Sequence, residues 1–135
     1  MKTYVIISLS IIVFLTACKP SKKEIDKMLD KAIEKIINSD NKGALEDLNK
    51  IISYDKDNYK AYYNRANTKF NLKQTKEALS DYNKAIELKP DYADAFYNRA
   101  FCKQYMNDKA GACNDWIRAA ALGKHDVNDE IKECR

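Results

Sequence analysis

Apolar and small residues recur along this chain at the spacing of one face of an α-helix. Ala78, Tyr82 and Ala85 are separated by four and then three residues, which places them on one helical stripe. Polar residues such as Asp81 and Lys84 lie between them. The pattern predicts amphipathic helices, each of which must bury its stripe against a neighbour.

The stripe repeats with a period of 34 residues, so that small residues align with small ones and bulky residues with bulky ones. Alanine in such columns lets paired helices approach closely, while the bulky residues fill the space beside them. The period divides the chain into units 25–58, 59–92 and 93–126. The aligned columns are Ala32, Ala66 and Ala100; Ala44, Ala78 and Ala112; and Leu48, Tyr82 and Trp116.

The middle unit carries the most complete motif. It has an aromatic residue and then Ala66 in its first helix, the Ala78, Tyr82, Ala85 series in its second, and a closing Pro90. This motif and period resemble the tetratricopeptide repeat, a helix–turn–helix unit of which about three are needed for stability. The third unit lacks the proline, and the first has Lys56 in its place. The resemblance implies an all-α solenoid of three units.

A short segment at 127–135 has the character of a capping helix. Val127, Ile131 and Cys134 recur at helical spacing among polar residues, and Asp126 can cap the helix at its start. Such a helix, expected at Val127–Cys134, would present one face to the last unit and the other to water, as the end of a solenoid requires.

The N-terminal segment is typical of an export signal. Its apolar run, residues 4–15, is too short to span a bilayer but suits the core of a signal peptide. The sequence Leu15-Thr16-Ala17-Cys18 that follows resembles the bacterial lipobox. The resemblance implies a signal peptide at 1–17, acylation of Cys18, a lipidated tether at 18–24, and a lipid-anchored protein of the bacterial cell membrane or outer membrane. An ordinary secretory signal or an uncleaved anchor remains the alternative.

Composition narrows the function classes. Three Gly and two Pro argue against a turn-rich β fold. The net charge of +4, from 24 basic and 20 acidic residues mixed along the chain, predicts no nucleic-acid partner. With one His, no paired acids at a plausible spacing and no Gly-rich phosphate loop, the sequence predicts neither an enzyme nor a cofactor or metal site.

Charged residues also follow the period. A base in each first helix is followed 16 residues later by an acid in the second, so we expect one structural ion pair per unit; anion binding by the basic residues is the alternative. The expected pairs are Lys31 with Asp47, Arg65 with Asp81, and Arg99 with Asp115.

Three cysteines remain if Cys18 is acylated. Cys113 begins the second helix of the last unit and Cys134 lies on the expected cap, so a disulfide between them could fasten the cap. The alternative is three small buried thiols.

In the tetratricopeptide family the first helices line a concave groove that receives a peptide or a partner helix. Asn64 and Asn98, one period apart, could bond a peptide backbone, although the aromatic residues could equally pack between helices. In some family members a Lys and an Asn bind the C-terminal carboxylates of chaperones. This sequence has Leu29 and Ile33 in their places, so binding of chaperone tails is not expected. The expected groove residues are Tyr63, Asn64, Asn67, Phe70, Asn71, Tyr97, Asn98, Phe101, Gln104 and Tyr105, together with Leu29, Asp30, Ile33 and Ile37 of the first unit.

These observations predict a membrane-anchored adaptor or assembly factor at the bacterial cell envelope, which binds a protein or peptide partner. One alternative is a structural envelope protein that self-associates as a homo-oligomer through Met28, Ile36 and Ile37 of its first helix. An envelope enzyme or a glycan-binding protein is a further alternative.

Overall fold

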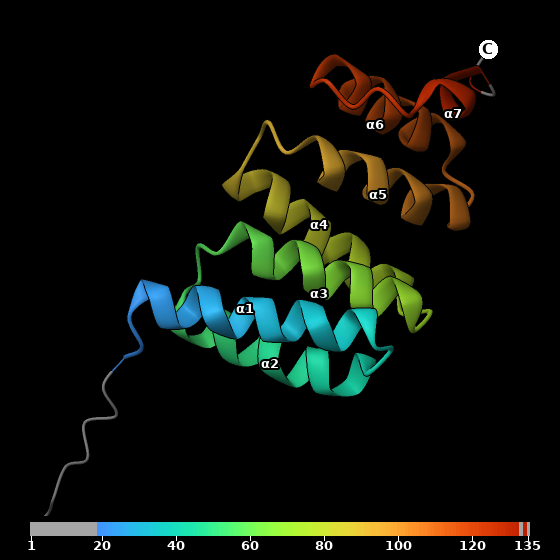
Figure 1. Cartoon of the computed structure of the whole chain (residues 1–135). Helices are drawn as coiled ribbons and strands as arrows, with labels where there is room; N and C mark the ends of the chain where they lie inside the picture. The colour runs from blue at the N-terminus through green and yellow to red at the C-terminus, as the bar shows by residue number, and fades with distance from the viewer. Residues whose placement is uncertain (1–18, 133, 135) are drawn as a thin grey trace, which may run out of the picture.

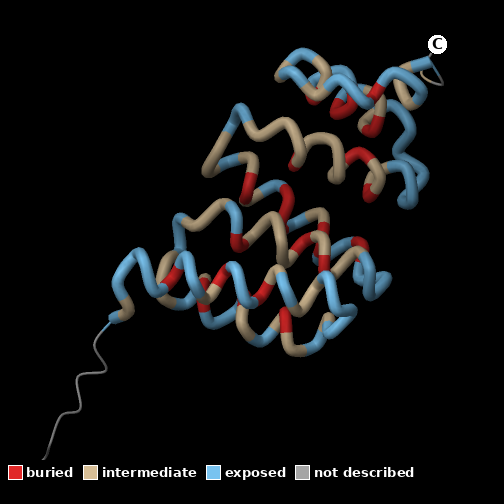
Figure 2. Tube along the Cα trace, viewed as in Figure 1, coloured by how far each residue is buried: buried red, intermediate tan, exposed pale blue. Residues whose placement is uncertain are grey.

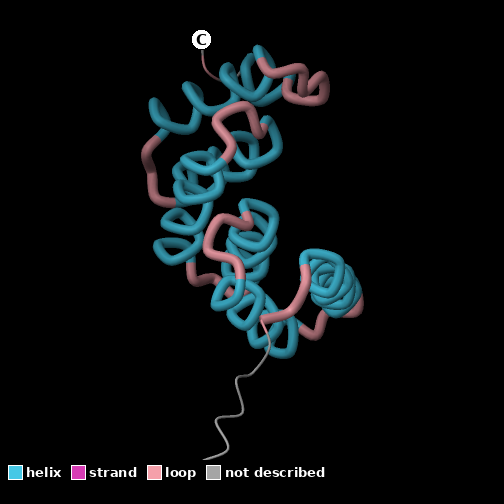
Figure 3. Tube along the Cα trace, turned by 90° about the vertical axis from the view of Figure 1, so that its left-hand side faces the viewer, coloured by secondary structure: helices cyan, strands magenta, loops and turns pink. Residues whose placement is uncertain are grey.

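Each 34-residue unit forms a hairpin of two α-helices, and the hairpins stack one on the next (Figure 1). The computed structural model describes residues 19–132 and 134, so the predicted signal peptide and Cys18 lie outside the described residues. No strand occurs in the described part, and the helices follow a curved path (Figure 3). The predicted all-α solenoid is confirmed. Its helices are α1 (Lys22–Ile37), α2 (Asn41–Tyr54), α3 (Tyr59–Asn71), α4 (Thr75–Leu88), α5 (Ala93–Tyr105), α6 (Lys109–Ala121) and α7 (Asn128–Lys132).

The three hairpins turn in the same way. Ser39, Lys73 and Asn107 lie one period apart, and each has a positive φ of 63–65°. The amide after each of them bonds a carbonyl five residues earlier, which closes the helix end as a Schellman motif. In the third unit, Asp108 then accepts from the amide of Gly111, where a β-carbon would collide with the carboxylate. The turn is therefore built from local backbone geometry that the period repeats.

The core runs along the line between paired helices (Figure 2). Ala66 and Ala78 are fully buried where α3 meets α4, and Tyr82 fills the space beside them. Equivalent positions are buried in the other two units, giving one core cluster in each. The alanine columns thus act as the sequence predicted. Among the described residues, no helix is long and apolar enough to cross a membrane.

The first helix begins inside the segment predicted to be a tether. The Ser21 hydroxyl accepts a bond from the Glu24 amide at 3.3 Å, and the Glu24 carboxylate accepts one from the Ser21 amide at 2.7 Å. This reciprocal capping box starts α1 at Lys22, whereas the tether was expected to extend to residue 24. The hydrogen bond from Ser21 lowers the pKa of Glu24. The Ser-x-x-Glu spacing was the signal that the sequence interpretation missed.

The C-terminal helix is shorter than the predicted Val127–Cys134. Asp126, expected to cap this helix, instead forms an ion pair with Lys124 at 3.3 Å, and α7 covers Asn128–Lys132. Val127 is fully buried. The structure joins Cys113 and Cys134 in a disulfide whose Cα atoms are 5.7 Å apart. A short helix and a covalent link therefore close this end of the stack.

The acids of units two and three are each held by two bases. Asp81 accepts two bonds from Arg65, at 2.7 and 2.8 Å, and one from Lys69 at 2.7 Å. Asp115 is bound in the same way by Arg99 and Lys103. The structure thus brings both predicted arginine pairs together and adds a lysine to each.

The predicted pair between Lys31 and Asp47 is wrong. Lys31 is exposed, and Asp47 binds Lys35 at 2.6 Å. The column of Lys31 pairs with the acid in the units where it holds an arginine, whose planar fork binds both carboxylate oxygens, and lysine lacks that fork. Lys35, Lys69 and Lys103 share one repeat column, and the lysine of this column pairs with the acid in every unit.

Because the ion pairs are buried to different degrees, substituting their acids should lower stability by different amounts. Asp81→Asn keeps the side-chain shape but leaves two cations beside a neutral amide at a site where the acid is only 7% exposed. We expect a loss of about 2–3 kcal/mol in the free energy of unfolding, measured by urea titration. Asp47→Asn is the matched control, because its side chain is 31% exposed and has one lysine partner. Equal losses in the two variants would contradict the assigned role of the buried acid.

Candidate functional site

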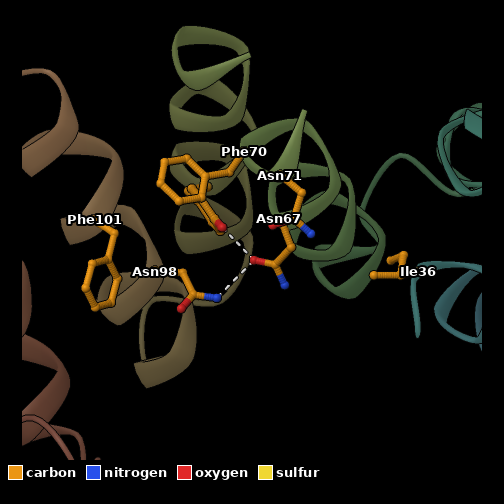
Figure 4. Close-up of a pocket in the computed structure, with 7 residues that line it drawn as sticks. Ile36, Asn67, Phe70, Asn71, Asn98 and Phe101 are labelled. Carbon is orange, nitrogen blue, oxygen red and sulfur yellow. Dashed lines mark hydrogen bonds between the residues drawn. The ribbon is translucent and has the colours of Figure 1, made fainter. Parts of the chain in front are cut away.

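A hollow of about 350 Å³ opens on the inner face of the stack, where the first helices of all three units converge (Figure 4). Three apolar side chains, three amides and one tyrosine line it, and we call this hollow the inner groove. Its residues are Ile36 of α1, Asn67, Phe70 and Asn71 of α3, Tyr82 of α4, and Asn98 and Phe101 of α5. The groove is therefore formed by all three units together.

Two asparagines in the inner groove are fixed by hydrogen bonds. The amide oxygen of Asn67 accepts from the Tyr82 hydroxyl at 2.5 Å and from the amide nitrogen of Asn98 at 2.9 Å. The same nitrogen of Asn98 donates to the Tyr63 hydroxyl at 3.0 Å. Among the described residues, the nitrogen of Asn67 and the oxygen of Asn98 have no partner, and both are turned away from the bond between the two amides (Figure 4). The groove thus presents one donor group and one acceptor.

Tyr63 supports this arrangement from behind. Its ring packs against Tyr82 and Tyr92, with centroids 6.1 and 4.9 Å apart, and burial raises its pKa. Because its hydroxyl holds the amide of Asn98, Tyr63 positions the groove but does not line it.

Asn64 does not match Asn98, although the two share a repeat column. Its amide donates to the carbonyl of Lys60 in its own helix at 2.8 Å, and it does not line the inner groove. Asn98 finds its partners on the preceding unit, at Tyr63 and Asn67. The corresponding residues of unit one are Leu29 and Ile33, which offer Asn64 no polar partner. The expected symmetrical pair is therefore absent because the units before each asparagine differ.

The remaining predicted groove residues lie around the rim or at the cap. Tyr105 is 65% exposed, with its ring edge-on to Phe70 at 6.4 Å. Gln104 lines a separate hollow of about 150 Å³ beside the disulfide. Tyr97 donates to Glu130 of α7 at 2.8 Å and so fastens the cap. Of the predicted groove residues, the structure places Asn67, Phe70, Asn71, Asn98 and Phe101 in the lining.

The sequence interpretation missed Ile36 and Tyr82 as groove residues. Ile36 was expected on a self-association face with Met28 and Ile37, but Met28 and Ile36 pack against the first core. Ile37 is the exposed member of that set, at 76%. Ile36 and Phe70 share a repeat column, which was the available signal. Tyr82 was recognised as a core residue, and its hydroxyl reaches the groove from there.

Metal ligands are not gathered in the part of the chain that the structure describes, where no three His, Cys, Asp or Glu residues are placed to hold an ion. The remaining free thiol in that part, Cys102, is buried, and burial raises its pKa to about 12.

Comparison with known proteins finds one repeat-family match and several similar folds. The tetratricopeptide repeat description matches residues 59–92. The structure is similar to the first TPR of Spaghetti (RPAP3) bound to HSP90 peptide SRMEEVD, with a TM-score of 0.80, 21% identity, and coverage of 86% of this chain and 94% of that one. It is also similar to the Yersinia enterocolitica type III secretion chaperone SycD in complex with a peptide of the translocator YopD, with a TM-score of 0.78, 11% identity, and coverage of 84% and 93%.

A third similar structure is the Arabidopsis OM64 TPR domain, with a TM-score of 0.79, 19% identity, and coverage of 84% of this chain and 95% of that one. No curated protein matches the sequence. The tetratricopeptide repeat match at residues 59–92 and the fold shared with tetratricopeptide repeat domains confirm the family resemblance seen in the sequence.

The buried tyrosines predict a loss of stability in alkali. Burial raises the pKa of Tyr63 and Tyr82, and raises that of Tyr97 to about 12, whereas an unfolded tyrosine ionises near pH ~10. The stabilising contribution is complete below the unfolded pKa and is lost as the pH rises through the folded values. Between about pH 7 and 11, urea titrations should give a free energy of unfolding that falls as the pH rises, first as the unfolded thiol of Cys102 ionises and more steeply above about pH 9, where the unfolded tyrosines ionise. Tyr82→Phe should make that fall shallower, and a fall that is identical in this variant would contradict the assignment.

Proposed function

We propose that this protein is an interaction adaptor that binds a segment of a partner polypeptide in the inner groove. The observation that carries the proposal is the fixed amide pair of Asn67 and Asn98, flanked by Phe70 and Phe101. The similar structures of the Spaghetti repeat domain and SycD, each with a peptide, support the same use of the fold.

The chemistry of the amide pair suits a peptide backbone. A peptide unit has one N–H donor and one C=O acceptor, and the groove presents an acceptor on Asn98 and a donor on Asn67. Because Tyr82 and Tyr63 already hold both amides, little side-chain freedom is lost on binding. Phe70 and Phe101 supply apolar contact to the side chains of the bound segment.

The proposal includes a lipid anchor at Cys18, supported by the lipobox-like Leu15-Thr16-Ala17-Cys18. Only residues 19–21 separate that cysteine from the start of α1, so an anchored domain would begin within roughly 14 Å of the acylated residue. Ile36 lies at the far end of the 16-residue α1, about 20 Å further along the helix axis. Anchoring would therefore raise the local concentration of the protein at the membrane while leaving the groove open to partners.

The groove proposal is tested by comparing the two asparagines of one repeat column. Peptides selected by the detergent-solubilised full chain from a random display library should bind the Asn98→Ala variant at least about tenfold more weakly, because the acceptor is lost and Asn67 is released. Asn64→Ala is the matched control, since its amide bonds only its own helix. Fluorescence anisotropy gives both affinities. Failure to select any peptide, or equal affinity for Asn98→Ala and the wild type, would contradict groove binding.

The anchor is tested separately. Cys18→Ser removes the thiol that would be acylated, so the protein should leave the membrane fraction or remain as an unprocessed precursor of higher mass. Fractionation and intact-protein mass spectrometry measure the two outcomes. Lys19→Ser, the neighbouring change that keeps the cysteine, should leave both unchanged. A processed and membrane-bound Cys18→Ser protein would exclude the anchor.

A further inference from the structure

Two lysines on the helices that line the inner groove are already paired with acids. Lys69 of α3 binds Asp81 at 2.7 Å, and Lys103 of α5 binds Asp115 at 2.8 Å. The arginines of the same helices bind the same two acids. The lining itself consists of neutral side chains. A carboxylate entering the groove would therefore lose water and meet no charged side chain in the lining, which is unfavourable.

The amide pair also lacks the charge that either end of a polypeptide would need. A carboxylate can accept from the amide nitrogen of Asn67, and an ammonium can donate to the amide oxygen of Asn98, but neither meets an opposite charge in the lining. Turning both amides over exchanges the two roles but still leaves one donor and one acceptor. An internal peptide unit satisfies both groups.

The apolar wall of the groove can hold one bulky side chain. Ile36, Phe70 and Phe101 come from three different units and face a common hollow of about 350 Å³. Phe101 is supported from behind by Trp116, with ring centroids 5.4 Å apart. Burying an aromatic or branched aliphatic side chain there would raise affinity by roughly tenfold to a hundredfold over an alanine.

We infer that the inner groove selects an internal, uncharged stretch of extended polypeptide with one aromatic or branched aliphatic residue, and that it rejects acidic chain ends. The inference rests on the proposed peptide-binding function and specifies its partner. The bound residue places its side chain against Phe70 and Phe101, and its N–H and C=O on Asn98 and Asn67.

Synthetic peptides of defined chemistry test this partner class. The first set consists of capped nonapeptides on neutral Ser/Thr backgrounds with Phe, Leu, Ala, Asp or Lys at the centre. The second set consists of the same peptides shortened to end at the central residue, which then carries a free C-terminal carboxylate, and SRMEEVD serves as an acidic chain end. Affinities for the full chain in detergent are measured by anisotropy. The capped Phe and Leu peptides should bind at least about tenfold more tightly than all others.

Three variants connect the result to the groove. Phe70→Ala should weaken binding of the capped Phe peptide at least about tenfold. Leu72→Ala is the matched control and should leave the affinity unchanged, because the Leu72 side chain is exposed and lies outside the lining. Asn67→Asp keeps an oxygen that accepts from Tyr82 and Asn98 but removes the donor, so it should also weaken binding of the capped Phe peptide while the protein stays folded.

The outcomes separate this inference from the function on which it rests. Tighter binding of SRMEEVD or of the free-carboxylate peptides, lost in Asn98→Ala, would overturn the partner class while leaving groove binding intact. Equal binding of the capped Phe and Asp peptides would overturn it as well. If no peptide in either set binds, both the partner class and groove binding fail.

Discussion

The guanidinium of one arginine holds three helices at once in this solenoid. Arg65 of α3 binds Asp81 of α4 in its own unit and donates to Asn49 of α2 in the preceding unit at 2.8 Å. Arg99 repeats the arrangement with Asp115 and Asn83. Alanine contacts let helices approach but do little to set how far one slides or turns against the next. A planar fork with fixed directions adds that constraint, so the angle between units, and with it the curvature of the inner face, depends on these bridges.

The residues that hold the units together and the residues of the candidate site lie on different sides of the same helices. Arg65 and Asn67 are two residues apart, which is roughly 200° around an α-helix, so they project toward nearly opposite sides of α3. The side that carries the arginine is almost identical in units two and three. The inner side varies: the column of Asn67 holds Ile33 in unit one and Phe101 in unit three. The arginine bridges therefore stay the same while the inner-face residue changes from one unit to the next, and this change gives the groove both polar and apolar side chains.

This separation also explains what the sequence could and could not predict. The helices, the period and the arginine pairs repeat, so three copies of the pattern reinforce one another. The pair of Lys31 with Asp47 was inferred by extending that pattern to a unit with lysine in place of arginine, and without the guanidinium fork the acid binds Lys35 alone. The start of α1 depends on a single capping box, and the extent of α7 on a disulfide and a buried Val127, none of which is periodic. Features that occur once receive no support from a repeat.

The amide pair shows why the site is harder to find than the fold. Asn98 is bound by residues 31 and 35 positions earlier, so its role is decided by the unit before it and not by its own repeat column. At the junction of units two and three, Tyr63 and Asn67 supply the polar partners; at the junction of units one and two, Leu29 and Ile33 supply apolar contact. A search of this chain by columns treats Asn64 and Asn98 as equals, whereas a comparison of successive junctions distinguishes them. In this solenoid, the informative unit for function is therefore the contact between two repeats, because the partners of an inner-face side chain such as Asn98 come from the repeat before it.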